Sequence, residues 1–483
     1  MRAARWLASI VVMGASLAAM AEPPGGQAAA VHVLNRLAYG PAPGDIERVT
    51  QMGVARYIDS QLYPESLELP AALNERLAAL DTVQRSSGEV LGDFLAVRDM
   101  VKDETDGARA MRREVLGRIA TQAAEARIAR AVASPRQLEE VMVDFWFNHF
   151  NVFSGKGQVR PLVASYERDA IRPYVFGSFR DMLGATAKHP AMLYYLDNYV
   201  SKAGGLNENY ARELMELHTL GVDKGYTQKD VTELARMLTG WTFAPRQVVA
   251  RNETFRFDPK RHDKGDKQWL GRTVKPQGQA EGEYALDVLA VHPATARHIS
   301  YKLAQYFVAD QPPPALVERM AQTWLASNGD IRSVLKALFA SAEFMAPETQ
   351  GAKFKTPYQF VISAARAAYV GNTRDSAGGS AVGSAAMLPE VKPVMGALDR
   401  LGMPLYGCQT PDGYKNTQAA WLNPDALSRR IGYAASLAQG ADVARLQAAL
   451  GGSVSARTRD IVAASPPKIR TAMLLGSPDF MQR

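Results

Sequence analysis

Apolar residues recur at helical spacing in a long succession of segments, and this pattern restricts the fold more than any other feature of the sequence. In the middle of the chain it covers residues 137–150, 166–187, 190–199, 208–220 and 228–238. It resumes at residues 283–289, 293–308, 314–327 and 331–344, and a charged, alanine-rich stretch precedes all of these at 93–133. Such a chain is predicted to fold as a mainly α protein, a multi-helix globular body.

The helical pattern is interrupted between residues 241 and 273. Thr254, Phe255 and Phe257 alternate there with Arg256, which is the two-residue period of a strand. We therefore expect a small inserted β-hairpin region. A stretch rich in Gly, Ser and Ala predicts a flexible linker over residues 371–385. This linker would separate a main helical domain, residues 22–370, from a C-terminal helical segment, residues 386–483, that packs on it.

The first 21 residues have the three parts of a signal peptide. Arg2 and Arg5 precede an apolar run over residues 6–20, and Ala19-Met20-Ala21 forms a small-x-small cleavage site. The run is too short to cross a bilayer of about 30 Å, and no later segment reaches the roughly 20 apolar residues that spanning requires. We expect a mature chain that starts near Glu22, lacks a stable transmembrane segment and is periplasmic or secreted. An anchor that is never cleaved is the alternative.

The net charge and the cysteine count argue against two kinds of protein. The formal charge is +7, and loss of the two signal-peptide arginines leaves 7 − 2 = +5. Basic and acidic residues are interleaved from Arg98 to Arg130, which is typical of solvated helix faces and argues against nucleic acid as a partner. Cys408 is the single cysteine, so no disulfide can form within the chain.

The densest polar segment, residues 207–218, carries the first candidate site. At about 100° per residue, Asn209, Glu213 and Glu216 fall within about 60° of one another, with Arg212 at their edge. Two glutamates on one face can supply a general acid and base, or oxygen ligands for a divalent cation. A structural ion-pair cluster of the glutamates with Arg212 and Arg236 is the alternative. His218 points about 140° to 160° away from the glutamates by the same geometry.

The helix predicted at 137–150 carries a second set of polar candidates. His149 shares an apolar face with Met142 and Phe145, so it is either a buried core residue or a ligand. Asn148 lies on a different, more polar face with Asp144. Asn148 and His149 are candidates for orienting a substrate.

The hairpin region contains the candidate metal residues His262 and Asp263. They open the segment His-Asp-Lys-Gly-Asp-Lys, in which oxygen ligands alternate around a glycine. The full calcium-loop pattern, with its distal glutamate, is absent, and a polar turn capped by its own aspartates is the alternative.

Several well-known catalytic motifs are absent from the sequence. It contains no H-E-x-x-H, no G-x-S-x-G, no C-x-x-C, no Walker loop and no glycine-rich dinucleotide turn. These absences argue against a standard zincin, serine hydrolase, thiol oxidoreductase, kinase or Rossmann dehydrogenase.

Specific segments along nearly the whole mature chain resemble one bacterial family, the one catalogued as domain of unknown function 1800. They include Leu34-Asn35-Arg36-Leu37, Asn148-His149-Phe150, residues 207–221 and 226–241, His262-Asp263, residues 292–296, Pro404-Leu405-Tyr406 and Trp421-Leu422-Asn423-Pro424. The segment from Cys408 to Tyr414 differs from the proline-rich stretch with Gly-Trp that is more usual in this family. The resemblance implies an exported, helical protein in an envelope or polymer-processing setting, where members are thought to work alongside exported proteins that resemble alkaline phosphatases.

Two hypotheses of function follow. The first is a periplasmic hydrolase-like enzyme that acts on an envelope or carbohydrate polymer. Glu213 and Glu216 would be its acid, base or metal ligands, Arg212 would tune their pKa values, and Asn148, His149 and Asn209 would orient the substrate. The second is a non-catalytic binding or assembly protein with an exported partner, in which the same cluster only locks helices together.

Overall fold

The computed structural model describes residues 26–100, 105–368, 388–437 and 442–483. Helices form most of these ranges, and the strands belong to two small antiparallel sheets, so the prediction of a mainly α fold is confirmed. The predicted signal peptide, residues 1–21, and the predicted linker, residues 371–385, both lie outside the described residues.

The helices follow one another in three sets along the chain. The N-terminal set is α1 Gly26–Leu37, α2 Asp45–Met52, α3 Val54–Leu62, α4 Ala71–Ala78, α5 Asp81–Gln84, α6 Ser87–Asp99 and α7 Asp106–Ala133. The central set is α8 Gln137–His149, α9 Val159–Ser165, α10 Phe179–Lys188, α11 Pro190–Tyr195, α12 Asn209–Glu216, α13 Gln228–Met237, α14 Pro245–Arg251, α15 Gln279–Ala290, α16 Pro293–Phe307, α17 Pro314–Ala326, α18 Ile331–Phe339, α19 Ala342–Met345 and α20 Pro357–Ala368. The C-terminal set is α21 Val391–Arg400, α22 Gln418–Trp421, α23 Pro424–Leu437, α24 Val443–Leu450, α25 Ala456–Ala464, α26 Arg470–Leu475 and α27 Pro478–Met481.

The inserted β region contains two small two-stranded sheets, and β3 and β4 form a hairpin. Strand β1 (Trp241–Thr242) pairs with β2 (Arg256–Phe257), and β3 (Lys267–Trp269) pairs with β4 (Arg272–Val274), all antiparallel. Helix α14 begins at Pro245 and separates the first two strands, because proline suits the first turn of a helix and ends the strand before it.

A single large cluster of buried apolar side chains joins the three sets of helices, from Ala30 in α1 to Met481 in α27. Four fully buried tryptophans are among its largest members: Trp146, Trp241, Trp269 and Trp324. The C-terminal helices pack on α7 and α20, and a short antiparallel bridge joins Phe354 to Gln482. The loop between α21 and α22 is thereby brought against α8, where the candidate site lies.

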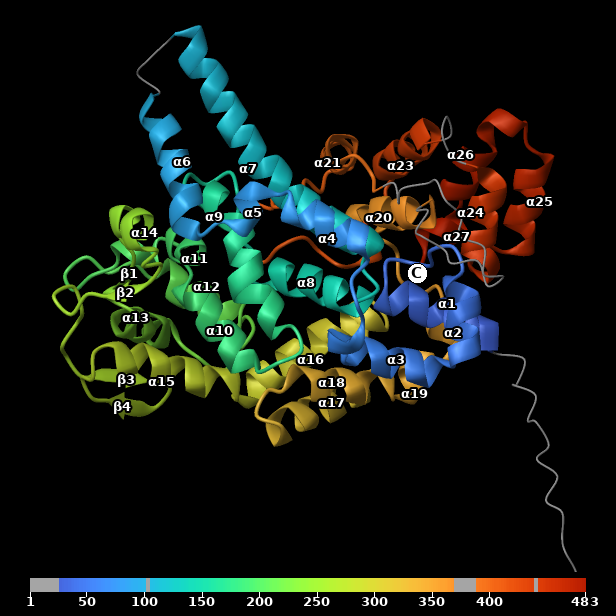
Figure 1. The fold of residues 1–483 in the computed structure, drawn as a ribbon. Helices are drawn as coiled ribbons and strands as arrows, with labels where there is room; N and C mark the ends of the chain where they lie inside the picture. The colour runs from blue at the N-terminus through green and yellow to red at the C-terminus, as the bar shows by residue number, and fades with distance from the viewer. Residues whose placement is uncertain (1–25, 101–104, 369–387, 438–441) are drawn as a thin grey trace, which may run out of the picture.

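Helices α6 and α7 form a pair that projects from the body, at the upper left of Figure 1. A capping box begins α6, in which the Ser86 hydroxyl accepts the N–H of Glu89 and the Glu89 carboxylate accepts that of Ser86. None of the helices in the described ranges, α7 included, combines the length and the apolar composition that a membrane crossing requires.

Candidate functional site

Helix α12 presents the predicted polar cluster at the edge of the core. Its apolar side, Tyr210 and Leu214, is fully buried, so the opposite side with Glu213 and Glu216 is only partly buried. The Asn207 side chain accepts the N–H of Asn209 and so satisfies one of the free donors at the start of the helix. The cluster is therefore held at a fixed place while its carboxylates remain accessible to water.

Arg212 locks α12 to the neighbouring helix α13. Its guanidinium lies 3.3 Å from Glu208 and 3.4 Å from Glu216, and it donates to Gln228 at 2.9 Å. The Gln228 amide and the Thr232 hydroxyl both donate to Glu208. Arg212 and Glu216 therefore have a structural task. Arg236, the other arginine considered for this cluster, pairs elsewhere, with Glu233 and Asp263.

Glu213 is not part of this lock. Within the described residues its carboxylate accepts no hydrogen bond and pairs with no cation, although it is half-buried. Burial raises the pKa of Glu213 to about 7, the neighbouring Glu216 and Asp412 charges add to the rise, and Arg212 offsets part of it. Glu213 can therefore hold or release a proton near neutral pH.

Asp412 reaches this site from the loop between α21 and α22. Partial burial opposes its ionisation, but hydrogen bonds from Lys415 at 2.5 Å and Thr410 at 2.6 Å lower the pKa of Asp412 below its usual value. Asp412 is therefore an ionised carboxylate within electrostatic range of Glu213, whose raised pKa favours the protonated form.

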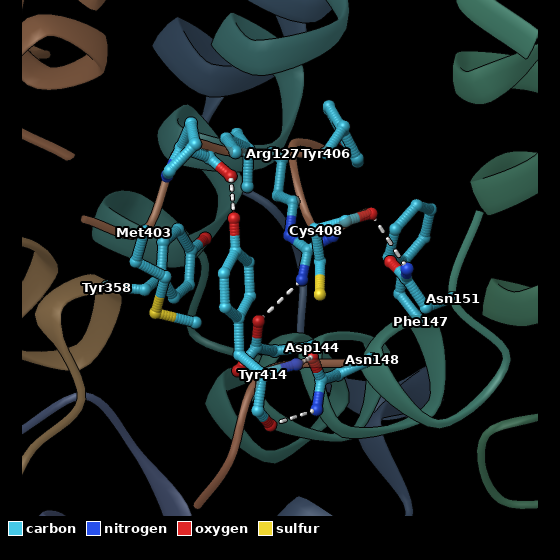
Figure 2. Close-up of a pocket in the computed structure, with 12 residues that line it drawn as sticks. Arg127, Asp144, Phe147, Asn148, Asn151, Tyr358, Met403, Tyr406, Cys408 and Tyr414 are labelled. Carbon is cyan, nitrogen blue, oxygen red and sulfur yellow. Dashed lines mark hydrogen bonds and ion pairs between the residues drawn. The ribbon is translucent and has the colours of Figure 1, made fainter. Parts of the chain in front are cut away.

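Two asparagines near the end of α8 hold this loop in place (Figure 2). Asn148 donates to the Tyr414 carbonyl at 2.9 Å and accepts the Tyr414 N–H at 2.8 Å. Asn151 donates to the carbonyls of Cys408 and Thr410. A side chain at Gly413, whose φ is +71°, would collide with the Asn148 backbone. The predicted residue Asn148 therefore anchors the loop that carries Asp412 through two hydrogen bonds to its backbone.

His149 is buried behind the loop and fixes a lysine. Its Nε2 lies 3.1 Å from the His218 carbonyl, which can only accept, so Nε2 carries the proton and Nδ1 has the lone pair. The Lys302 ammonium therefore donates to Nδ1, at 2.8 Å. Burial, then the nearby Lys302 charge, hold the pKa of His149 well below its usual value. His149 acts as a neutral acceptor that positions Lys302.

Lys302, which donates to His149, also lies within electrostatic range of Asp412. Burial lowers the pKa of Lys302 to about 8, while the Asp412 charge works in the opposite direction. Two further imidazoles lie near His149, with ring centroids 6.1 Å away for the buried His218 and 6.4 Å away for the partly buried His298. The site thus combines the Glu213 carboxyl, whose pKa is raised, the ionised Asp412 carboxylate and the Lys302 amine, whose pKa is lowered by burial.

A cavity beneath the loop is too small for a polymer. It measures about 30 Å³ and is lined by Asn148, Asn151, Cys408 and Tyr414 together with Arg127 and its partners. This is room for one or two waters. Arg127 forms buried ion pairs with Asp144 at 2.5 Å and Glu167 at 3.2 Å. The charged side chains around this cavity therefore neutralise one another.

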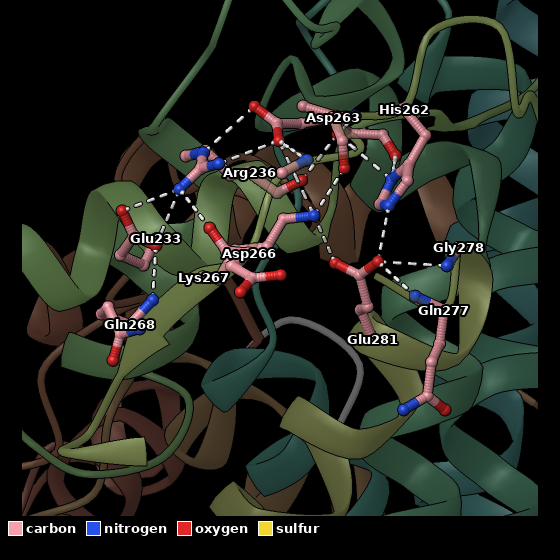
Figure 3. A network of polar contacts seen from close by, with 12 residues as sticks. Glu233, Arg236, His262, Asp263, Asp266, Lys267, Gln268, Gln277, Gly278 and Glu281 are labelled. Carbon is pink, nitrogen blue, oxygen red and sulfur yellow. Dashed lines mark hydrogen bonds and ion pairs between the residues drawn. The ribbon is translucent and has the colours of Figure 1, made fainter. Parts of the chain in front are cut away.

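The predicted metal residues lie in a separate network around the two small β sheets (Figure 3). Arg236 binds both oxygens of Asp263, at 2.9 and 3.0 Å. His262 has Nδ1 2.9 Å from the Thr239 carbonyl and Nε2 2.9 Å from the Glu281 carboxylate. Both ring nitrogens thus face oxygen atoms of the protein, so neither points to an open position for a metal.

The described ranges contain no group of three or more His, Cys, Asp or Glu side chains that could hold a metal ion. The assignment of His262 and Asp263 to a divalent cation stays a prediction. Asn209, the remaining candidate, is exposed and makes one long side-chain hydrogen bond, 3.4 Å to the Leu196 carbonyl.

Lys302 and Asp412 are the site residues that the sequence patterns did not identify. Lys302 follows His298 by four residues in a predicted helix, and this spacing places both on one face. Asp412 lies in the segment that differs from the usual family pattern, and nothing in the periodicity of the chain connects it with α12.

Comparison with known proteins gives one match. The family model described as "Protein of unknown function (DUF1800)" matches residues 32–482. No curated protein and no solved structure matches the chain.

Proposed function

The chain belongs to the DUF1800 family, whose model covers nearly all of it, and we propose that it is an exported, hydrolase-like enzyme that acts on an envelope or carbohydrate polymer. Export is inferred from the signal-peptide pattern of residues 1–21. The class of reaction is inferred from the side chains that meet around α12.

The observation that carries the proposal is a pair of carboxyl groups whose environments push their pKa values apart. The pKa of Glu213 is raised to about 7, first by burial, and that of Asp412 is lowered by its hydrogen bonds from Lys415 and Thr410. Such a pair divides the roles of acid and base at neutral pH. Hydrolysis of a glycosidic bond uses two carboxyl groups in this way.

Each residue then has a role. Glu213 donates its proton to the leaving oxygen as general acid. The Asp412 carboxylate either takes a proton from the attacking water or attacks the anomeric carbon itself; in the second case water then hydrolyses the glycosyl-enzyme, with Glu213 as base. Lys302 lies within electrostatic range of Asp412, and its positive charge favours the ionised form of that carboxylate. His149 and Asn148 are positioning residues, because they act through Lys302 and through the loop.

Turnover of polymers by the purified mature protein tests the proposal. Peptidoglycan and neutral and acidic polysaccharides are incubated with the protein, and new reducing ends are counted across pH 4 to 9. We expect activity to fall as pH rises through about 7, where Glu213 loses its proton. Glu213→Gln and Asp412→Asn should each lower kcat by about 10² or more.

Glu216→Gln is the matched control, since Glu216 lies three residues away on the same helix but is tied to Arg212. It should retain most of the activity. If Glu213→Gln and Asp412→Asn remain as active as the control, the assignment is wrong. If no polymer is turned over and Glu213→Gln destabilises the protein, the binding or assembly role is favoured instead.

A further inference from the structure

A larger cavity lies away from the candidate active site, along the projecting pair of helices α6 and α7 that Figure 1 shows. It measures about 240 Å³ and opens to solvent between the end of α6, the first half of α7 and the loop that precedes α9. This is somewhat below the ~300 Å³ at which pockets for drug-sized ligands begin, so it suits a small chemical group.

Among the described residues, three arginines and no carboxylate line this cavity. Arg98 comes from α6, Arg112 from α7 and Arg160 from α9. Arg98 forms an exposed ion pair with the adjacent Asp99. Arg112 and Arg160 are partly buried, and across the described part of the chain neither guanidinium has an ion pair or a hydrogen bond. Two guanidinium groups are therefore held in one cavity without a counter-charge.

The remaining walls are apolar or lack side chains. Phe94 lies one turn before Arg98 on α6, and Leu116 lies one turn after Arg112 on α7, so each helix presents an apolar and a cationic residue together. Gly155 and Gly157 form the third wall, where a side chain would collide with the rings of Phe153 and Tyr194 respectively. Neighbouring side chains of the protein therefore restrict both positions to glycine, and this wall adds no side chain to the cavity.

We propose that this cavity binds the phosphate group of an anionic ligand, contacted by the guanidinium groups of Arg112 and Arg160. A guanidinium matches two oxygens with a planar pair of donors. A phosphate monoester carries a charge of about −1.5 to −2 and three terminal oxygens, so it can balance two guanidiniums that arrive from different helices, whereas a carboxylate carries a single charge. The Phe94 and Leu116 side chains then contact the apolar part of the ligand.

The ligand is either a free phosphate compound or the headgroup of a lipid, and binding measurements separate these sources. Isothermal titration calorimetry with inorganic phosphate and with glycerol 3-phosphate tests the first. Sedimentation with phosphatidylglycerol vesicles, against phosphatidylcholine vesicles, tests the second. Both use the mature chain in a low-salt buffer free of phosphate and sulfate.

Variants decide whether the cavity is responsible. Arg112→Ala and Arg160→Ala should each weaken binding roughly tenfold, because each removes a charge-assisted contact. Their melting temperatures should not change, since neither side chain has a partner within the described ranges. Arg113→Ala is the matched control, because it removes the same charge from the adjacent position of α7 but lies outside the cavity lining.

Binding of phosphate compounds with this variant pattern supports a soluble ligand, and binding of phosphatidylglycerol vesicles alone with the same pattern supports a lipid headgroup. Absence of binding in every arm overturns the proposal. A loss of binding in Arg113→Ala as large as in Arg112→Ala also overturns it, because attraction would then come from the general charge of the helix. The outcome does not depend on Glu213, so this inference and the proposed function can fail separately.

Discussion

The Glu213→Gln variant should be more stable than the natural protein at alkaline pH and not at acidic pH. The pKa of Glu213 rises on folding from its ordinary 4.5 to about 7, mainly through burial. A raised pKa means that the folded state binds the proton more tightly, so the stabilisation from that proton is fully present below about pH 4.5. It is lost as pH rises through about 7. Glutamine resembles the protonated acid at every pH.

The size of this stability difference follows from the pKa shift of Glu213 and from how far its side chain is exposed to water. The difference 7 − 4.5 is 2.5, and each unit corresponds to about 1.4 kcal/mol, which gives roughly 3.4 kcal/mol for a fully buried group. Glu213 is only half-buried, and screening by water reduces this to about 1 to 1.5 kcal/mol. For a chain of this length, that is a rise in melting temperature of about 1 to 2 °C at pH 8.5.

Scanning calorimetry of both proteins from pH 4.5 to 8.5 measures the effect. The increase in melting temperature of Glu213→Gln over the natural protein should grow with pH between about 5 and 8 and vanish at the acidic end. Glu216→Gln is the control, since it breaks the 3.4 Å pair with Arg212 and should lower stability by about 0.5 kcal/mol or less. A fall in melting temperature in Glu213→Gln at pH 8.5 would refute the reasoning, because it would mean that the Glu213 carboxylate stabilises the fold.

Three further predictions concern the surroundings of the site. Arg127→Met should lower the free energy of unfolding by about 3 to 5 kcal/mol in urea titrations, since it leaves the buried carboxylates of Asp144 and Glu167 without their shared cation; a loss under 1 kcal/mol would contradict this. Asn148→Ala should speed the reaction of the buried Cys408 thiol with Ellman's reagent, because the loop loses both bonds between Asn148 and Tyr414; an unchanged rate would show that other contacts hold the loop. His262→Ala should lower the free energy of unfolding by about 1 to 3 kcal/mol through the lost contacts to Thr239 and Glu281; if bound metal, measured by inductively coupled plasma mass spectrometry, disappears instead, His262 is a ligand after all.

The sequence predicted helices well where start signals and periodicity agree. The segment 137–150 became α8, Gln137–His149, and the segment 293–308 became α16, which starts at Pro293 behind a histidine that caps it. The segment 208–220 was predicted too long, because α12 ends at Glu216. The chain turns there through Thr219, whose hydroxyl donates to the Leu214 carbonyl, and Gly221, whose φ is +93°. Local periodicity does not detect such a turn.

The candidate site was predictable only within each helix. Helical geometry relates Arg212 to Glu216 and Glu208 by four residues, and both ion pairs exist. Asp412 comes to the site through bonds between Asn148 and Tyr414, which are separated by 266 positions. That approach depends on how the C-terminal helices pack on α7 and α20, and no pattern of spacing contains this information.

The contrast between Glu213 and the other buried acids favours catalysis over assembly at this site. A carboxylate that serves only structure gains stability from a cation or from donors. Glu281 has them in Lys267 and His262, and Glu167 has them in Arg127 and Tyr406. Glu213 lies one residue from an arginine that bonds elsewhere, so its burial destabilises the fold without compensation from the described residues. A carboxyl group whose burial lowers the stability of the fold is expected at a site where its proton takes part in a reaction.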